Sequence, residues 1–181
     1  FFKSGLNPRA DTHTSLAQVF SGHGEGLVMK GGKAVKESRK PAHMDRMSAE
    51  TLVRSAVELY ARHQPGAQAR RLVVHKTSHF WPEETAGIEA ALPNDMRLDL
   101  VALSTESDIR FMRSGTHPPL RGTCIRLSEQ QTAMFTVGYI PEFRLYPGAK
   151  VPRPIVLTHE RGDSTRETIC RELLALTKLN W

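Results

Sequence analysis

The residues best placed to do chemistry follow a short apolar run in the first half of the chain. Leu72–Val74 are typical of a buried strand, and the polar stretch His75–His79 comes directly after them. In open α/β sheets, ligands bind at the carboxyl ends of strands, so this stretch is a candidate site. His75 and His79 have the spacing of a metal pair on a helix, but here they follow a strand and no HExxH pattern is present. We therefore interpret both histidines as polar strand-end residues and not as metal ligands.

A second polar group surrounds a turn rich in glycine and proline, residues 115–122. Arg113 precedes this turn, Arg121 lies within it and Thr123 follows it. Tight turns bring backbone N–H groups and arginine side chains close to phosphate oxygens. The pattern predicts that Arg113, Arg121 and Thr123 bind nucleic acid, with Arg121 the strongest candidate.

Composition and charge restrict the class of protein. The chain has 181 residues, of which 39% are hydrophobic and 24% charged, and this predicts a single soluble domain spanning residues 1–181. Its net charge of +6 suits nucleic acid, although an anionic membrane surface or an acidic partner would suit it too. No apolar run is long enough to span a membrane. Because the chain opens on Phe1-Phe2-Lys3 and ends just after a helical pattern, we expect a fragment of a longer protein.

The two cysteines, Cys124 and Cys170, are far apart in the sequence. Neither belongs to a Cys-x-x-Cys pair, which argues against a zinc site and against a redox motif. The sequence therefore predicts two reduced, partly buried thiols in a cytoplasmic protein.

Hydrophobic periodicity predicts strands alternating with helices. Ser48 is expected to cap the first helix, and Pro82-Glu83-Glu84 to start the second, with both acids favouring its N-terminus. Gly31-Gly32 is expected to end the second strand of an opening hairpin. The resulting order is an α/β fold with a mixed sheet. The expected strands are 15–20, 26–29, 72–74, 98–103, 109–112, 124–127, 134–137 and 155–157, and the expected helices are 48–63, one from 82 and 164–179.

Four segments follow one another across nearly the whole chain. They are the hairpin 17–20 and 24–32, the helix 48–63 with Arg71-Leu-Val-Val-His-Lys-Thr-Ser78, the stretches 113–115 and 118–123 with strands ending at 135–138, and the stretches 146–148 and 151–154 with the helix 164–179. In this order they resemble the PIWI domain of prokaryotic Argonautes. This resemblance implies a ribonuclease H-like α/β fold, a mixed sheet flanked by helices. It also implies a protein that holds a short guide RNA or DNA and pairs it with a target nucleic acid.

The same resemblance predicts an inactive nuclease. Active PIWI domains use two divalent metals held by carboxylates, since Mg²⁺ and Mn²⁺ prefer hard oxygen ligands. The aspartate expected after strand 72–74 aligns with Thr77, and Phe1–Lys3 supply no acid where the first catalytic aspartate is expected. We therefore expect neither catalytic residues nor a metal in this domain. The alternative is a slicer, dependent on Mg²⁺ or Mn²⁺, that uses Asp45 and ligands outside this fragment.

The resemblance also suggests further nucleic-acid ligands and partners. Lys76 is expected to face phosphate in place of the lost metal charge, and Lys178 and Asn180 to lie near the channel for the guide's 5′ region. The implied role is guide-dependent target binding in cytoplasmic defence against invading DNA, together with an associated effector nuclease. The other alternative is a scaffold whose PIWI fold docks a partner protein.

Overall fold

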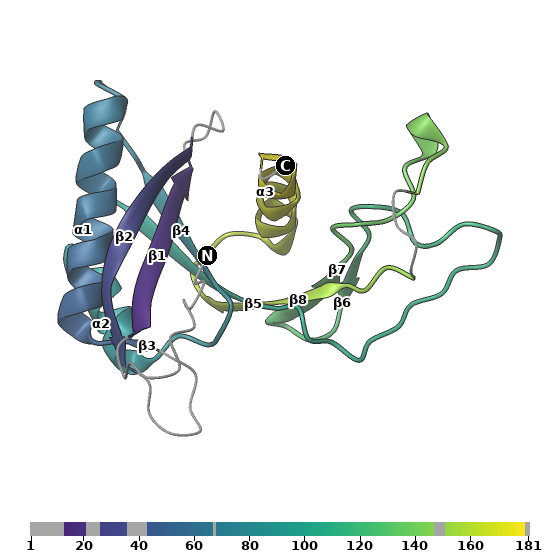
Figure 1. Cartoon of the computed structure of the whole chain (residues 1–181), viewed down its shortest axis with the longest axis horizontal. Helices are drawn as coiled ribbons and strands as arrows, with labels where there is room; N and C mark the ends of the chain where they lie inside the picture. Colours follow the sequence, from purple (N-terminus) through teal and green to yellow (C-terminus); the bar gives the residue numbers. More distant parts are fainter. Residues whose placement is uncertain (1–12, 21–25, 36–42, 67, 147–150, 180–181) are drawn as a thin grey trace. The chain divides into compact units, whose positions relative to one another are not determined.

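Strands and helices both occur along the chain in the computed structural model, which describes residues 13–20, 26–35, 43–66, 68–146 and 151–179 (Figure 1). The chain divides into two compact units, Phe1–Leu100 and Val101–Trp181. The single domain expected from the sequence stays a prediction. The described elements are β1 (His13–Phe20), β2 (Gly26–Val35), β3 (His43–Met44), α1 (Arg46–His63), β4 (Arg71–Lys76), α2 (Pro82–Ala91), β5 (Arg97–Ser104), β6 (Cys124–Arg126), β7 (Gln131–Met134), the 3₁₀ helix η1 (Pro141–Phe143), β8 (Ile155–Arg161) and α3 (Arg166–Leu179).

The first sheet is antiparallel, with the strand order β1-β2-β3. The pairing of β1 with β2 is irregular between Thr14 and Leu16, where one residue of β1 faces Gly31 and Gly32 of β2. This is a β-bulge, a feature that glycine in a strand often marks. The expectation that Gly31-Gly32 ends the strand is therefore wrong, because β2 continues to Val35.

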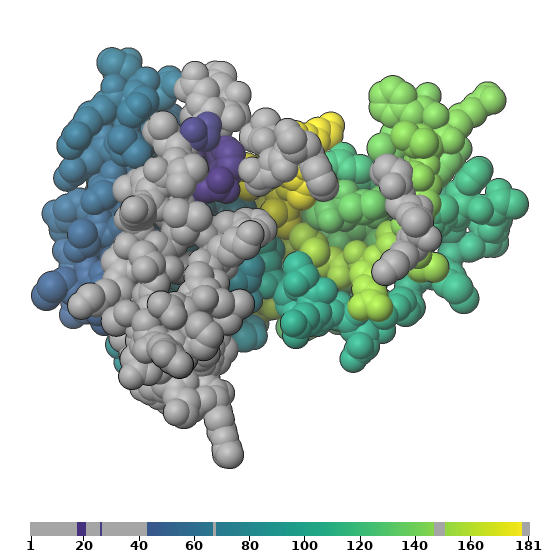
Figure 2. Space-filling model, in the orientation of Figure 1, coloured from purple at the N-terminus to yellow at the C-terminus, as the bar shows by residue number. Residues whose placement is uncertain are grey.

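Helices α1 and α2 pack against each other in the first unit (Figure 1). Ala49 and Val53 of α1 and Ile88 of α2 are buried in one apolar core, which Leu72 and Val74 of β4 also contact. The opposite face of α1 is polar, and the helix forms part of the visible surface (Figure 2). Such a one-sided apolar stripe is what fixes an amphipathic helix on a sheet.

The N-terminus of α1 differs in one detail from the sequence prediction. Asp45, not Ser48, is the N-cap, and its Oδ1 accepts a hydrogen bond of 2.7 Å from the Ser48 backbone N–H. Aspartate is as good an N-cap as serine, so composition alone did not distinguish the two positions.

The second sheet has five strands, in the order β4-β5-β8-β7-β6. β6 and β7 pair antiparallel, and so do β7 and β8. β4 and β5 are neighbours joined through α2, the kind of connection that parallel strands require. The predicted α/β class with a mixed sheet is therefore confirmed. Among the described helices, none combines the length and hydropathy needed for a membrane crossing.

Two predicted strands need correction. Ile109–Met112 is not a strand; there the Arg110 guanidinium bonds the carbonyls of Ser107 and Ile109, both at 3.0 Å. The strand expected at 134–137 is β7, which begins at Gln131. The strand begins earlier than expected because a compact turn precedes it, in which Ser128 Oγ accepts a hydrogen bond of 3.0 Å from the Gln131 N–H. The pairing of β7 with β6 therefore starts directly after this turn.

Candidate functional site

The carboxyl end of β4 lies in the first unit and ends in a buried lysine. Lys76 is only 3% exposed. Its Nζ lies 2.5 Å from Glu84 Oε2 and donates a 3.1 Å hydrogen bond to the carbonyl of His79. The Lys76 ammonium also lies over the Phe80 ring, 5.6 Å from its centroid. The positive charge at this strand end is therefore balanced inside the protein.

Glu84 joins three elements through its carboxylate. Its Oε1 accepts from the Met44 N–H of β3 at 2.8 Å, and its Oε2 accepts from the Trp81 N–H at the start of α2 at 2.9 Å, besides the bond to Lys76 of β4. The predicted capping role of Glu84 is thus confirmed. The Glu84 carboxylate is 1% exposed and its Oε2 lies against the Lys76 ammonium, so a metal ion bound there would lie beside a buried positive charge.

Next to this ion pair lie the two positions that the resemblance singled out. Thr77, at the place of the expected aspartate, is exposed and immediately follows β4. Asp45 uses Oδ1 for the Ser48 N–H and Oδ2 for the Ser48 hydroxyl, at 2.7 and 3.2 Å. His43, two residues before Asp45, stacks on Trp81 with ring centroids 4.5 Å apart. The strand end is therefore bordered by a neutral hydroxyl, a capping carboxylate and a stacked ring pair.

These donors do not fit a pair of divalent ions. Thr77 offers only a neutral oxygen, Glu84 is already paired with the Lys76 cation, and Asp45 caps α1. Among the residues that the structure describes, no three His, Cys, Asp or Glu side chains are grouped so that they could hold a metal.

In the second unit, Arg121 connects the 115–122 turn to α3. Its Nε donates to the carbonyl of Thr136 at 2.9 Å, and its Nη2 donates to Thr177 Oγ1 at 2.8 Å and to the carbonyl of Leu174 at 3.4 Å. Thr123 is half-buried, and its carbonyl accepts from the Phe135 N–H at 2.9 Å. These contacts give both residues a structural role, whatever else they bind.

The remaining predicted ligands differ in exposure. Arg113 is exposed in the loop before the turn, and Lys178 is exposed in the last turn of α3. The Arg121 guanidinium bonds Thr177, the residue before Lys178 in the sequence. Asn180 lies outside the described residues. Nucleic-acid contact by any of these side chains stays a prediction.

Sequence reasoning missed that the two cysteines meet. The Cys170 thiol hydrogen-bonds Cys124 and lowers the pKa of Cys124 from 9.0 to about 7, against the opposing effects of partial burial and the Glu167 charge. The same bond and burial raise the pKa of Cys170. Nothing in their sequence spacing could have indicated this, because the two residues come near each other only through contacts of the preceding turn, at Arg121 and Gly122, with α3.

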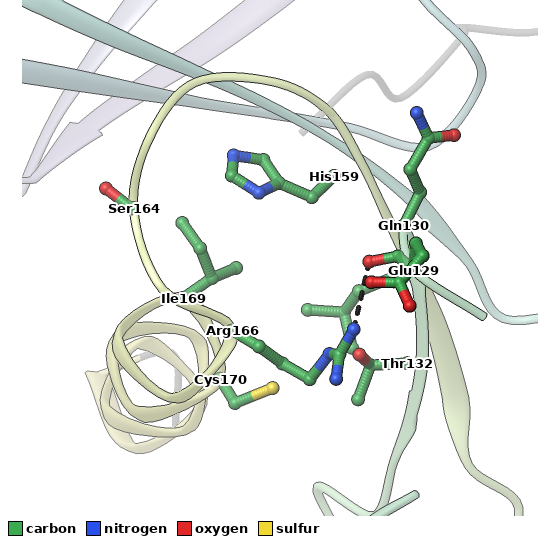
Figure 3. Close-up of a pocket in the computed structure, with 9 residues that line it drawn as sticks. Glu129, Gln130, Thr132, His159, Ser164, Arg166, Ile169 and Cys170 are labelled. Atoms are coloured by element: carbon green, nitrogen blue, oxygen red, sulfur yellow. Dashed lines mark hydrogen bonds between the residues drawn. The ribbon is translucent and has the colours of Figure 1, made fainter. Parts of the chain in front are cut away.

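A cavity of about 140 Å³ lies between α3 and the β7–β8 side of the second unit (Figure 3). Arg166 borders it and donates from Nη2 to the carbonyls of Ser128 and Glu129, at 3.1 and 2.9 Å. Cys170 and Ile169 line the helix side, and His159 lines the strand side. The cavity is small, mixed in polarity, and adjoins one of the two thiols.

No family model matches the sequence, and no curated protein is similar to it. Solved structures of Argonautes do resemble it. An A. aeolicus Argonaute matches 93% of this chain with a TM-score of 0.65 at 18% identity. A Marinitoga piezophila Argonaute, solved with a 5′ OH guide RNA and target DNA, matches 97% with a TM-score of 0.68 at 14% identity. This chain covers 22% and 25% of those two chains. The fold is accordingly the ribonuclease H-like PIWI fold of Argonautes, as the sequence predicted.

Proposed function

We propose that this protein takes part in guide-dependent binding of a target nucleic acid and does not cut the target. The observation that carries the proposal is the likeness to an Argonaute solved with guide RNA and target DNA, which extends over 97% of this chain. Base pairing would then select the target sequence, while the protein grips the backbones. The net charge of +6 favours contact with two phosphate backbones.

The arrangement at the end of β4 supports binding without cleavage. In-line cleavage by two metals needs carboxylates that are open to the ions. Here Thr77 replaces the expected aspartate, Glu84 neutralises Lys76, and Asp45 caps α1. In this arrangement Asp45 and Glu84 both stabilise the fold, and Thr77 supplies no carboxylate.

The proposed biological role is defence against invading DNA, in which an associated effector nuclease acts on the target that this protein has located. A protein that binds without cutting needs such a partner for any damage to the invader. The choice between an RNA and a DNA guide depends on contacts to the 2′-hydroxyl.

The first test is to purify the full-length protein from its own cells and sequence the nucleic acid bound to it. We expect short strands of uniform length, and their sugar identifies the guide as RNA or DNA. If no nucleic acid is bound and synthetic guides also fail to bind, the proposal is wrong and a protein-docking scaffold is favoured.

The second test addresses cleavage. The guide-loaded protein is incubated with a complementary end-labelled target in Mg²⁺ and, separately, in Mn²⁺. We expect the target to be retained intact. A cut at one fixed position along the guide, absent when the guide is omitted, would contradict the inactive state and establish a slicer.

A further inference from the structure

Two thiols far apart in the sequence lie near each other in the second unit, where residues 121 and 122, just before β6, contact α3. Cys124 is the first residue of β6, and Cys170 lies in the first half of α3. The Cys124 thiol donates to the carbonyl of Gly122 at 3.4 Å, and the nearby Cys170 lowers the pKa of Cys124. Both residues belong to the second unit, so the contact does not depend on how the two units are placed.

Neighbouring contacts hold this segment on one face of the helix. A Cβ atom on Gly122 would come within 3.1 Å of Leu174, one turn beyond Cys170. Arg121 bonds Thr177, which lies almost another turn further along. Residues 170, 174 and 177 share one helical face, because positions four and seven apart recur on the same side. Positions 121 and 122 thus approach positions 177 and 174 of α3 in turn, and continuing in the same direction brings Cys124 toward Cys170.

The two thiols are chemically unequal. Cys124 is exposed, whereas Cys170 is only 6% exposed. Hydrogen bonding by Cys170 lowers the pKa of Cys124 to about 7, so that a large fraction of Cys124 is thiolate near neutral pH. The thiolate is the reactive form of cysteine, and accessible sites of low pKa next to a second cysteine are the ones that oxidants modify.

We propose that Cys124 and Cys170 form an oxidation site at which a hydroperoxide converts the two thiols into a disulfide linking β6 to α3. In the first step the Cys124 thiolate attacks the terminal peroxide oxygen. The O–O bond breaks, Cys124 becomes a sulfenic acid, and hydroxide or alkoxide leaves. In the second step the Cys170 sulfur attacks the Cys124 sulfur. The S–S bond forms, the S–O bond breaks, and the Cys170 proton leaves with the hydroxyl as water. The peroxide is thereby reduced by two electrons and the thiol pair is oxidised by two.

Small molecules reach Cys124 from solvent, and the cavity beside α3 offers a separate route to Cys170. Cys170 lines the cavity together with Thr132 and Arg166, and its sulfur projects toward the strand side (Figure 3). A small reductant could reach the resolving sulfur from this side after the disulfide has formed.

To test the proposal, the protein is treated with hydrogen peroxide and its remaining thiols are then blocked with an alkylating reagent. The intact mass and the peptide map are measured without reduction. The wild-type protein is expected to lose two hydrogen atoms, give a Cys124–Cys170 peptide, and regain both thiols with dithiothreitol. Cys170→Ser should retain a sulfenic acid at Cys124, which dimedone traps. Cys124→Ser should react much more slowly, since its remaining thiol is buried. The rate of Cys124 alkylation in the unoxidised protein should rise as the pH passes through about 7.

Circular dichroism of both variants establishes that they are folded before their reactivity is compared. Two results would overturn the proposal. One is a wild-type protein whose thiols both remain alkylatable after peroxide treatment, and the other is equal peroxide reactivity in Cys124→Ser and the wild type. A disulfide found solely between two copies of the protein would also contradict it.

Discussion

At the residue scale, the buried contact between Lys76 and Glu84 determines what the end of β4 can do. The two charged atoms are 2.5 Å apart, and the two side chains are 3% and 1% exposed. A buried pair of this kind adds little stability compared with apolar residues, but losing one partner leaves a charge without compensation. Lys76 was expected from the sequence to face phosphate. In the structure its ammonium faces Glu84, so a phosphate contact would require the pair to separate.

We predict that Lys76→Met lowers the free energy of unfolding by about 3–5 kcal/mol, because it leaves the Glu84 carboxylate buried without its cation. Urea denaturation provides the measurement. The matched control is Arg54→Met, which removes the cation of the exposed Glu50–Arg54 pair on α1 and should cost about 0.3–0.5 kcal/mol. If both variants lose the same small amount, the Lys76–Glu84 pair is not buried as described.

The cap of α1 gives a second prediction at this scale. Asp45→Ala should destabilise the protein by about 1 kcal/mol, because it removes the acceptor for the Ser48 N–H. Ser48→Ala should cost less, since the Ser48 hydroxyl only donates a longer bond of 3.2 Å to Asp45. Thermal melts of the two variants decide between the caps, and a larger loss for Ser48→Ala would favour the position expected from the sequence.

At the element scale, the packing of α1 on α2 depends on one glycine. A Cβ on Gly87 would lie 2.2 Å from the carbonyl oxygen of Arg46 and 3.0 Å from the Ala49 Cβ. Backbone cannot rotate away as a side chain can, so the helices would have to separate. That contact also positions α2, whose Glu84 bonds β3 and β4. The helix pair therefore supports the arrangement at the end of β4.

We predict that Gly87→Ala destabilises the protein, although alanine is the better helix former by about 1 kcal/mol. Overpacking costs about 1–3 kcal/mol, and a backbone clash belongs at the upper end of this range. Ala90→Ser, at an exposed position of the same helix, is the control and should change stability by less than about 0.5 kcal/mol. Stabilisation by Gly87→Ala, measured by urea unfolding, would be incompatible with this close contact.

At the scale of the whole molecule, the proposed function depends on net charge and on the cations that solvent can reach. The chain has 25 Lys and Arg residues against 19 Asp and Glu. Some arginines are committed to the fold, as Arg121 is by its bonds to Thr136 and Thr177. Others, such as Arg113, are exposed on loops. Exposed cations of this kind supply the salt-dependent part of nucleic-acid binding.

We predict that Arg113→Ala weakens binding of guide-loaded protein to all targets alike and reduces the slope of log K against log salt by about 1. Arg62→Ala is the control, because it removes the same charge from the exposed face of α1, where Arg62 pairs with Glu58. Binding titrations at several salt concentrations provide the measurement. If the two variants behave identically, Arg113 contributes only to the general charge of the protein.

The sequence by itself determined the α/β class and the order of most elements, since hydrophobic periodicity and turn residues are local signals. The resemblance to PIWI domains came from four segments of matching sequence in the same order. It also placed Thr77 where a carboxylate was expected. The prediction failed at 109–112, where Arg110 bonds nearby carbonyls and no strand forms. It also failed at Gly31-Gly32, where the two glycines form a bulge inside β2 and do not end the strand.

Only the tertiary structure decided which charged groups satisfy one another. Whether Lys76 faces solvent or Glu84, and whether Cys124 meets Cys170, depends on elements that are distant in the chain and packed in three dimensions. Burial then sets the consequences, because a charge or a thiol away from water is governed by its nearest partners. Residue types predict what chemistry is possible, and packing determines which of these side chains remain available for it.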